Sequence, residues 1–180
     1  GSKAFAREFM TRHSIPSPRY EVCSSLEDAL AFVEKAPLGY PYVVKADGLA
    51  AGKGTVMVGD QAEARAVVEQ IMGDKKFGSA GAKVVMEEFL EGEEVSFLVF
   101  SDGSRVVPMA SVQDHKRALD GDKGPNTGGM GTVSPTTNIS LDGHKRIMQE
   151  IVVPTVAGRA AEGRRFQGVL FAGLMMTESG

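Results

Sequence analysis

Residues 43–55 read Val-Val-Lys-Ala-Asp-Gly-Leu-Ala-Ala-Gly-Lys-Gly-Thr, a short β-branched strand that carries one lysine into a glycine-rich loop with another. Backbone N–H groups in glycine-rich segments can converge on anionic oxygens, because no side chain stands in the way. Lys45 on the strand and Lys53 on the loop would then neutralise different phosphate groups. The loop contacts are predicted at Gly52, Lys53 and Gly54. This stretch therefore predicts a polyphosphate site.

The Walker P-loop is the main alternative for this stretch, but the spacing does not fit it. That motif needs four residues between its glycines and a Ser or Thr directly after its lysine. Here three residues separate Gly48 from Gly52. Gly54 follows Lys53, so the hydroxyl of Thr55 comes one position late. The next residues are typical of a second strand, which indicates a β-hairpin over the phosphates. The remaining alternative is a hairpin whose glycines only make a flexible turn.

Composition limits the class of protein. The chain has 180 residues, a formal net charge of −3 and a pI near 5.7, which gives no electrostatic basis for binding nucleic acid. The single cysteine, Cys23, excludes an intramolecular disulfide and a cysteine metal cluster. No apolar run approaches the ~20 residues that span a bilayer, and no signal peptide is recognisable. We expect a reduced, cytoplasmic setting, no membrane partner and no metal ligands among these residues.

Apolar periodicity and chain-breaking residues give the expected elements. Helices are predicted over residues 3–13, 26–35, 61–73 and 141–162, and strands over 19–22, 42–46, 56–58, 83–88, 94–100, 105–112 and 168–177. Residues 114–139 are predicted as a long loop, which in a compact domain indicates a functional or disordered segment. Pro154 either kinks the last helix or begins a second one. The last strand is strongly apolar and no partner strand follows it, so we expect a fragment of a longer protein.

Residues 87–94, Glu-Glu-Phe-Leu-Glu-Gly-Glu-Glu, form a second candidate site, an acidic bend between two strands. An adenine ring needs an acceptor for its amine and backbone groups along its edge, and a ribose needs a carboxylate for its hydroxyls. Glu87 would accept a hydrogen bond from the amine, and Glu94 would accept from the ribose. The backbone of three residues would meet the ring edge: Glu88, Phe89 and Leu90. The alternative is a solvated acidic turn, which the two apolar residues within it argue against.

Residues 113–117, Gln-Asp-His-Lys-Arg, and 124–131, Gly-Pro-Asn-Thr-Gly-Gly-Met-Gly, form a third candidate site. Three contiguous ionisable side chains before a four-glycine loop can present positive charge to a phosphorylated substrate. The catalytic candidates are His115, Lys116 and Arg117, with His115 either a general base or a hydrogen-bonding residue. The substrate-binding candidates are Asp114, Asn126, Thr127, Gly128, Gly129, Met130 and Gly131.

Together, the motifs KADGLAAGKG, EEFLEGEE, QDHKR and GPNTGGMG resemble the ATP-grasp superfamily and, within it, the phosphoribosylamine–glycine ligases (glycinamide ribonucleotide synthetases). The resemblance covers nearly the whole chain. It implies an α+β fold of two small lobes that enclose a nucleotide cleft, with residues 47–54 closing on the phosphates. We expect about 1–40 and 110–180 in one lobe and about 41–109 in the other. The chain would be a partial ATP-grasp domain truncated at its C-terminus, with the other domains of the parent absent.

The resemblance also implies a reaction of purine biosynthesis. ATP would phosphorylate the carboxylate of glycine, and the amine of 5-phosphoribosylamine would capture the glycyl phosphate, giving glycinamide ribonucleotide, ADP and phosphate. The phosphate-binding lysines of the family match Lys45 and Lys53. Its adenine and ribose positions match Glu87, Leu90 and Glu94.

Mg²⁺ or Mn²⁺ would be held by residues beyond position 180, so the resemblance implies that the fragment alone is inactive. Its partners would be the small-molecule substrates and the rest of the parent chain. Two alternatives stay open: another ATP-grasp carboxylate–amine ligase, or a non-catalytic nucleotide-binding module.

Overall fold

A computed structural model describes residues 1–50, 54–121 and 123–178, with the backbone but not the side chains of residues 125 and 126. It is a mixed α+β structure, as the sequence predicts, and every strand pairing in it is antiparallel. None of the described helices is long and apolar enough to cross a lipid bilayer.

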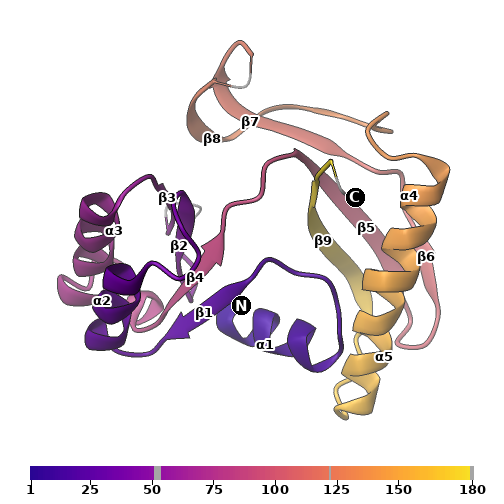
Figure 1. Cartoon of the computed structure of the whole chain (residues 1–180). Helices are drawn as coiled ribbons and strands as arrows, with labels where there is room; N and C mark the ends of the chain where they lie inside the picture. Colours follow the sequence, from indigo (N-terminus) through magenta and orange to yellow (C-terminus); the bar gives the residue numbers. More distant parts are fainter. Residues whose placement is uncertain (51–53, 122, 179–180) are drawn as a thin grey trace. The chain divides into compact units, whose positions relative to one another are not determined.

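The chain divides into two compact units: residues 1–12 with 17–89, and residues 13–16 with 90–180 (Figure 1). This division differs from the expected lobes. The strand at 20–23 pairs with the strand at 84–88, which keeps residues 20–40 in the first unit. The strands between 93 and 108 pair with the strand at 168–176, which places them in the second unit. Backbone hydrogen bonds between segments far apart in sequence set the boundary, and local patterns do not reveal them.

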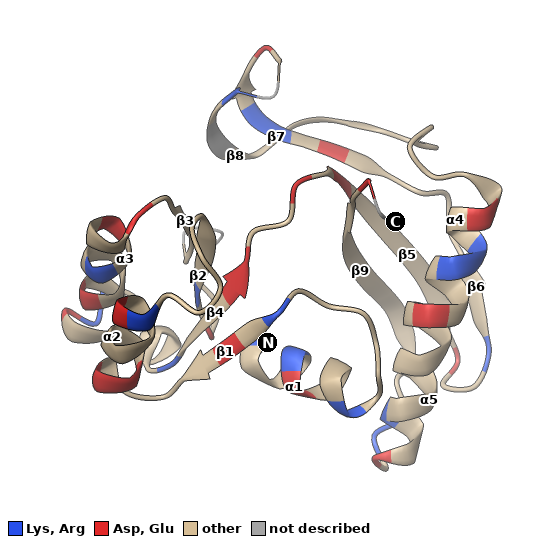
Figure 2. Ribbon diagram, in the orientation of Figure 1, with Lys and Arg blue, Asp and Glu red and all other residues tan. Residues whose placement is uncertain are grey.

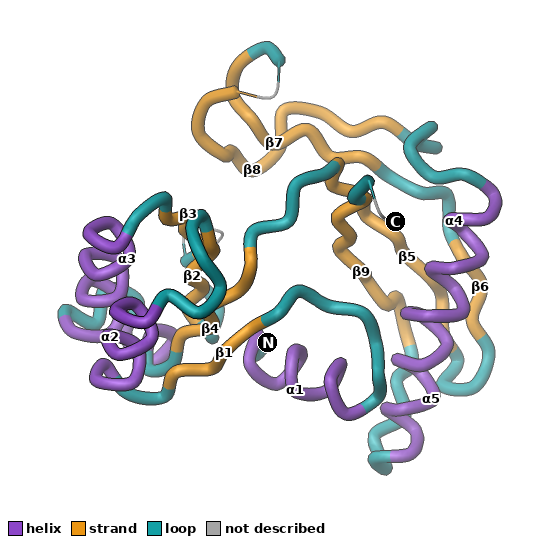
Figure 3. Tube along the Cα trace, viewed as in Figure 1, coloured by secondary structure: helices purple, strands orange, loops and turns teal. Residues whose placement is uncertain are grey.

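The first unit is built on a four-stranded sheet with the order β1-β4-β2-β3. Its strands are β1 (Tyr20–Cys23), β2 (Tyr42–Ala46), β3 (Thr55–Val58) and β4 (Val84–Glu88). Two helices, α2 (Leu26–Lys35) and α3 (Gln61–Val68), cover one face of this sheet (Figure 3). Alternate residues of β2 point into that core, so Tyr42, Val44 and Ala46 are fully buried.

The helices of the first unit begin where short polar side chains cap them. The Ser25 hydroxyl accepts a hydrogen bond from the N–H of Asp28, and an Asp60 carboxylate oxygen accepts from the N–H of Glu63. After α3 the chain continues through a π-helical turn (Glu69–Gly73) and a 3-10 turn (Gly78–Gly81). On the other face of the sheet, α1 (Lys3–Arg12) packs against β4. This second face carries the charged residues of the candidate site.

The second unit is built on a three-stranded sheet with the order β6-β5-β9. Its strands are β5 (Glu93–Ser101), β6 (Val106–Pro108) and β9 (Gly168–Met176). A continuous helical run packs on one face: α4 (Leu141–Arg146), the π-helical segment Ile147–Val152, and α5 (Val153–Ala161). Pro154 is the second residue of α5, and Val152 and Val153 before it are already helical, so Pro154 does not begin a separate helix. It lies where the run changes from π-helical to α-helical hydrogen bonding.

The prediction of a long loop over residues 114–139 is wrong for most of that segment. Two strands, β7 (Gln113–Leu119) and β8 (Lys123–Val133), pair as an antiparallel ribbon. The register is broken: His115 lies opposite Gly131 and Arg117 lies opposite Asn126, so four residues of β8 face Lys116 alone. Glycine and proline disfavour strands, but pairing with β7 satisfies the backbone of this segment, and the bulge accommodates the extra residues.

Candidate nucleotide and substrate site

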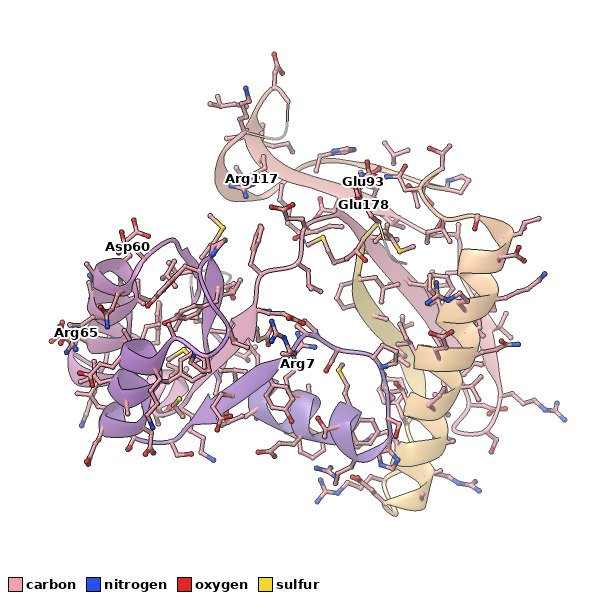
Figure 4. The ribbon with its side chains drawn as sticks, viewed as in Figure 1. Arg7, Asp60, Arg65, Glu93, Arg117 and Glu178 are labelled. Carbon is pink, nitrogen blue, oxygen red and sulfur yellow. The ribbon has the colours of Figure 1, made fainter. Side chains whose placement is uncertain are left out.

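Lys45 belongs to a partly buried charge cluster on α1, β2 and β4. Its Nζ donates to Oε2 of Glu87 at 2.5 Å, and Arg7 donates to both Glu87 oxygens, each at 2.8 Å. The Glu87 side chain is only 3% exposed. Burial alone would raise its pKa, but the bonds from Arg7 and Lys45 outweigh that effect and hold the pKa below its ordinary value. Figure 4 shows Arg7 reaching from α1 toward this end of β4.

Lys3, which the sequence reasoning missed, joins the same cluster. Its Nζ donates to the backbone oxygens of Ala46 at 2.7 Å and Gly48 at 3.0 Å, so it binds the point where β2 enters the glycine loop. Burial lowers the pKa of Lys3, and the neighbouring Lys45 charge adds to that effect. No local pattern marks this residue, because a single lysine in the first turn of an amphipathic helix looks like any solvated charge.

The cluster carries more positive than negative charge. Its members are Lys3, Arg7, Lys45, Asp47 and Glu87, three cations against two carboxylates. Each cation is already oriented by a carboxylate or a backbone carbonyl, so an anion would meet donors with little freedom left to lose. The arrangement suits a phosphate group at the end of β2.

The glycine-rich segment 47–54, which is expected to close on the phosphates, lies partly outside the described residues. Gly52 and Lys53 are among the residues that the structure does not describe. Gly54 is described: its carbonyl accepts a hydrogen bond from the Ala46 N–H at 2.7 Å. A Cβ atom on Gly54 would lie 2.5 Å from the Cβ of Ala50, so the hairpin needs glycine at this position. The antiparallel pairing of β2 (Tyr42–Ala46) with β3 (Thr55–Val58) agrees with the predicted hairpin.

The acidic bend begins at the end of β4, where Figure 2 shows the acidic residues in red. The Glu88 side chain has a structural role. Its carboxylate accepts hydrogen bonds from the backbone N–H of Arg19 at 2.8 Å and from Nε of Arg19 at 2.6 Å. Its own N–H donates to the Arg19 carbonyl. Phe89 is 36% exposed and available for contact. Leu90, within the bend, is where the second unit resumes after residues 13–16.

Glu94 and the Gln-Asp-His-Lys-Arg segment meet within the second unit. Lys116 Nζ lies 2.9 Å from an oxygen of Glu94 and 4.0 Å from an oxygen of Asp114. Glu94 is 52% exposed and Asp114 is 25% exposed. The alternation of β7 places Asp114 and Lys116 on one face and His115 on the other. The contiguous cations therefore do not all face one ligand, as the sequence suggested they would.

An open cavity of about 450 Å³ lies between the β7–β8 ribbon and the sheet of the second unit. The ribbon contributes four predicted substrate-binding residues and the residue next to them, Thr132. The four are Asp114, Gly128, Gly129 and Gly131. The sheet contributes Ser96, Leu98 and Phe171. The structure thus brings the acidic residue of the first segment together with the glycines of the second.

The bulge of β8 is held in shape by Thr127. Its hydroxyl donates to the carbonyl of Lys116 at 2.9 Å and accepts from the N–H of Gly129 at 3.1 Å. Gly129 has a φ of 130°, a conformation that favours glycine, and a Cβ atom there would lie 3.0 Å from Oδ1 of Asp114. Thr127 therefore acts on the shape of the cavity, not on its lining.

The remaining candidates lie elsewhere. Arg117 donates to the carbonyl of Gly124 at 2.8 Å and so closes the ribbon (Figure 4). His115 is exposed, and Met130 is 62% exposed. The side chain of Asn126 is outside the described residues. The structure therefore favours Asp114 and Lys116 over His115 and Arg117 as residues close to the cavity.

Comparison with known proteins gives a match over the whole chain. The model of the phosphoribosylglycinamide synthetase ATP-grasp (A) domain matches residues 1–180. A phosphoribosylamine–glycine ligase of Allochromatium vinosum is 54% identical over all 180 residues, which is 42% of the length of that protein. The chain thus spans about two fifths of the curated relatives that it matches.

Solved structures agree with this match. The crystal structure of phosphoribosylamine–glycine ligase from Thermotoga maritima superposes with a TM-score of 0.89 and 38% identity, covering 99% of this chain and 44% of that one. A D-alanine–D-alanine ligase from Bacillus anthracis complexed with ATP has a TM-score of 0.63 and 20% identity, covering 98% of this chain and 52% of that one. This second likeness concerns the fold alone.

Proposed function

Because the chain belongs to the phosphoribosylglycinamide synthetase ATP-grasp (A) domain family, we propose that it forms the ATP-binding part of a phosphoribosylamine–glycine ligase. The substrates would be ATP, glycine and 5-phosphoribosylamine. Since the chain spans 42% of its curated relatives, the complete reaction belongs to the longer protein that contains such a domain.

The charge cluster around Lys45 is the observation that carries the proposal. A triphosphate needs cations whose positions are set before it binds, because ordering long side chains costs free energy. Lys3 and Lys45 are held by hydrogen bonds within the first unit, at the root of a glycine loop. We assign Lys45 and Lys3 to the phosphates and, following the family, Lys53, Gly52 and Gly54 to the loop that covers them.

The proposed chemistry solves a specific problem: a carboxylate is a poor electrophile. A glycine carboxylate oxygen attacks the γ-phosphorus of ATP, the bond to the bridging oxygen breaks, and ADP leaves. The amine nitrogen of phosphoribosylamine then attacks the carbonyl carbon of glycyl phosphate, phosphate leaves, and the amine loses a proton. The task of the protein is to position the reactants, stabilise the negative charge and exclude water.

We divide the remaining residues between nucleotide and substrates. Glu87, Glu88, Phe89, Leu90 and Glu94 remain the adenine and ribose candidates. The cavity beside the ribbon is the candidate for the substrates that receive and donate the acyl group. Lys116, next to this cavity, is the best placed of the three catalytic candidates, because its ammonium lies between two carboxylates and is oriented by both.

In residues 1–50, 54–121 and 123–178, no three His, Cys, Asp or Glu side chains gather as metal ligands would. Mg²⁺ in a nucleotide site can also be held by one or two carboxylates together with the phosphates of the nucleotide. Following the family, we assign the ligands of Mg²⁺ or Mn²⁺ to residues beyond position 180. On that assignment, we expect the 180-residue chain alone to bind ATP without producing ADP when glycine and phosphoribosylamine are present.

Calorimetry of ATP binding to the purified chain tests the proposal. Lys45→Ala should weaken binding by about 1.5–3 kcal/mol, the range for hydrogen bonds to charged groups. Lys145→Ala is the matched control, because that lysine is 70% exposed on α4 and pairs only at the surface with Asp142. An unchanged affinity in a folded Lys45→Ala variant would exclude the assignment. ATP binding without any ligase activity in the longer protein would favour a nucleotide-binding module instead.

A further inference from the structure

Asp47, the residue that follows β2, caps the start of α1 from a distant part of the chain. Its Oδ1 accepts a hydrogen bond from the backbone N–H of Ala4 at 2.7 Å and a second one from the hydroxyl of Ser2 at 2.9 Å. Its backbone carbonyl accepts from the N–H of Lys3 at 3.1 Å. The first N–H groups of a helix have no partner within the helix, so Asp47 satisfies two of those of α1.

The charge of Asp47 also suits this place. The first turn of α1 contains no acidic residue and carries Lys3, although a helix N-terminus favours negative charge. Burial lowers the pKa of Lys3, and the Asp47 carboxylate works against that effect, which favours the charged ammonium. One side chain therefore supports both the start of the helix and the cation that it carries.

Asp47 is itself held from the other side by the segment before β4. Its N–H donates to the carbonyl of Lys83 at 3.0 Å, and the N–H of Gly48 donates to the carbonyl of Ala80 at 3.0 Å. A Cβ atom on Gly48 would lie 2.7 Å from the Cβ of Ala80, so this approach requires glycine. The end of β2 is thus bonded on both sides, and the Asp47 carboxylate is presented to α1 in one position.

These contacts connect Asp47 to the cations of the charge cluster. Lys3 and Arg7 are four residues apart and lie on the same face of α1. Lys3 Nζ binds the two carbonyls that flank Asp47, and Arg7 binds Glu87, which also holds Lys45. The helix is therefore fixed to β2 at its start and to β4 one turn later. Where α1 starts determines where both of its cations lie.

We propose that Asp47 is a positioning residue for the phosphate site, because its hydrogen bonds set where α1 begins and thus where Lys3 and Arg7 lie. This inference rests on the proposed function, which gives these cations a phosphate ligand. It also predicts a sign opposite to that of simple electrostatics. Removing a carboxylate beside an anion site should strengthen ATP binding if charge alone mattered. Loss of the position of the cations should weaken it.

Calorimetry of ATP binding to the 180-residue chain tests the proposal with two variants. Asp47→Ala removes both hydrogen bonds of the side chain and should weaken ATP binding about fivefold or more, the factor that matches the usual cost of a lost helix cap. Both bonds go to Oδ1, so an amide oxygen can replace it, and Asn caps helices about as well as Asp. Asp47→Asn should therefore bind ATP at least about threefold more tightly than Asp47→Ala.

Asp60→Ala is the matched control. It removes the carboxylate that caps α3 in the same unit, and α3 carries no residue of the charge cluster. The control should lose a comparable amount of stability but bind ATP like the parent chain. Asp47→Glu serves if Asp47→Ala does not fold, because it keeps the charge and moves the oxygens by one methylene. Positioning predicts ATP binding about threefold or more weaker than the parent, whereas charge alone predicts no change.

Four results would overturn the proposal. They are Asp47→Ala binding ATP as tightly as the parent or more tightly, Asp47→Asn binding no better than Asp47→Ala, Asp47→Glu binding like the parent, and Asp60→Ala weakening ATP as much as Asp47→Ala. A parent chain that binds no ATP would reject the nucleotide site together with this inference. ATP binding by the parent that no Asp47 variant changes would preserve the nucleotide site and reject the role of Asp47 alone.

Discussion

Lys45 and Glu87 form an ion pair of 2.5 Å on adjacent strands, and the carboxylate is almost completely buried. Arg7 donates twice to the same carboxylate, so three donors already occupy Glu87. A carboxylate offers about four lone-pair sites, which leaves one for an adenine amine. Glu87, the residue expected to recognise the adenine base, therefore also orients Lys45, the residue expected to bind the phosphates.

Glu87→Gln should destabilise the chain by about 3 kcal/mol, because it leaves Arg7 and Lys45 partly buried without their counter-charge. Urea denaturation of the variant and the parent chain measures the difference. Glu94→Gln is the matched control, since its pair with Lys116 is about half exposed and should contribute about 1 kcal/mol or less. Equal losses in the two variants would contradict the importance given to burial.

Acid should weaken the chain partly through the same carboxylate. The pKa of Glu87 is lowered from its ordinary 4.5, so near and below that pH the unfolded chain binds protons that the folded chain does not. The stabilisation is present above pH 4.5 and is lost as the pH falls through the lower, folded-state pKa. Glu88 acts in the same direction, because the Arg19 N–H lowers its pKa.

Denaturation curves from pH 7 to pH 3 check this pH dependence. The stability advantage of the parent chain over Glu87→Gln should shrink in the acid range. A constant difference across that range would mean that Glu87 keeps its ordinary pKa in the folded chain.

Substitution of the ribbon glycines should separate fold from binding. Gly129→Ala combines a φ of 130° with a contact of 3.0 Å to Asp114, and we expect a loss of about 1–3 kcal/mol in stability. Gly131→Ala meets open space and should change stability by less than about 0.5 kcal/mol. Thermal melting of both variants is the measurement. A Gly131→Ala variant as unstable as Gly129→Ala would show that the space is filled.

The Tyr42 hydroxyl is buried without a hydrogen-bond partner among the described residues. Burying such a group costs free energy, so Tyr42→Phe should leave stability unchanged or raise it by about 1 kcal/mol. The ring itself must stay, because it stacks on Tyr40 and meets Phe32 edge-on. Calorimetric melting would reveal the effect. A loss above about 1 kcal/mol would mean that the hydroxyl has a partner, such as a buried water.

The elements that the sequence predicts best are those whose signals are local. The helix at 26–35 and the strand at 42–46 occur at the residues expected, because apolar spacing and the prolines around them act within a few residues. The family match agrees with the motifs KADGLAAGKG and GPNTGGMG, because a motif is defined by residue types and their order and needs no coordinates. The pairing of the strands on either side of the glycine-rich segment after Lys45 was predicted from the same kind of local signal.

Contacts across long stretches of chain needed the folded structure. Arg7 and Glu87 are 80 positions apart, and no local sequence pattern around either residue predicts that they pair. The ribbon at 113–133 looks like a loop until its backbone pairs, and that pairing separates Asp114 from His115. Periodicity in the sequence indicates which face of a helix or strand is apolar. The partners of charged side chains and backbone donors are set only in the folded structure, because packing brings the groups together and removes the water that would otherwise bind them.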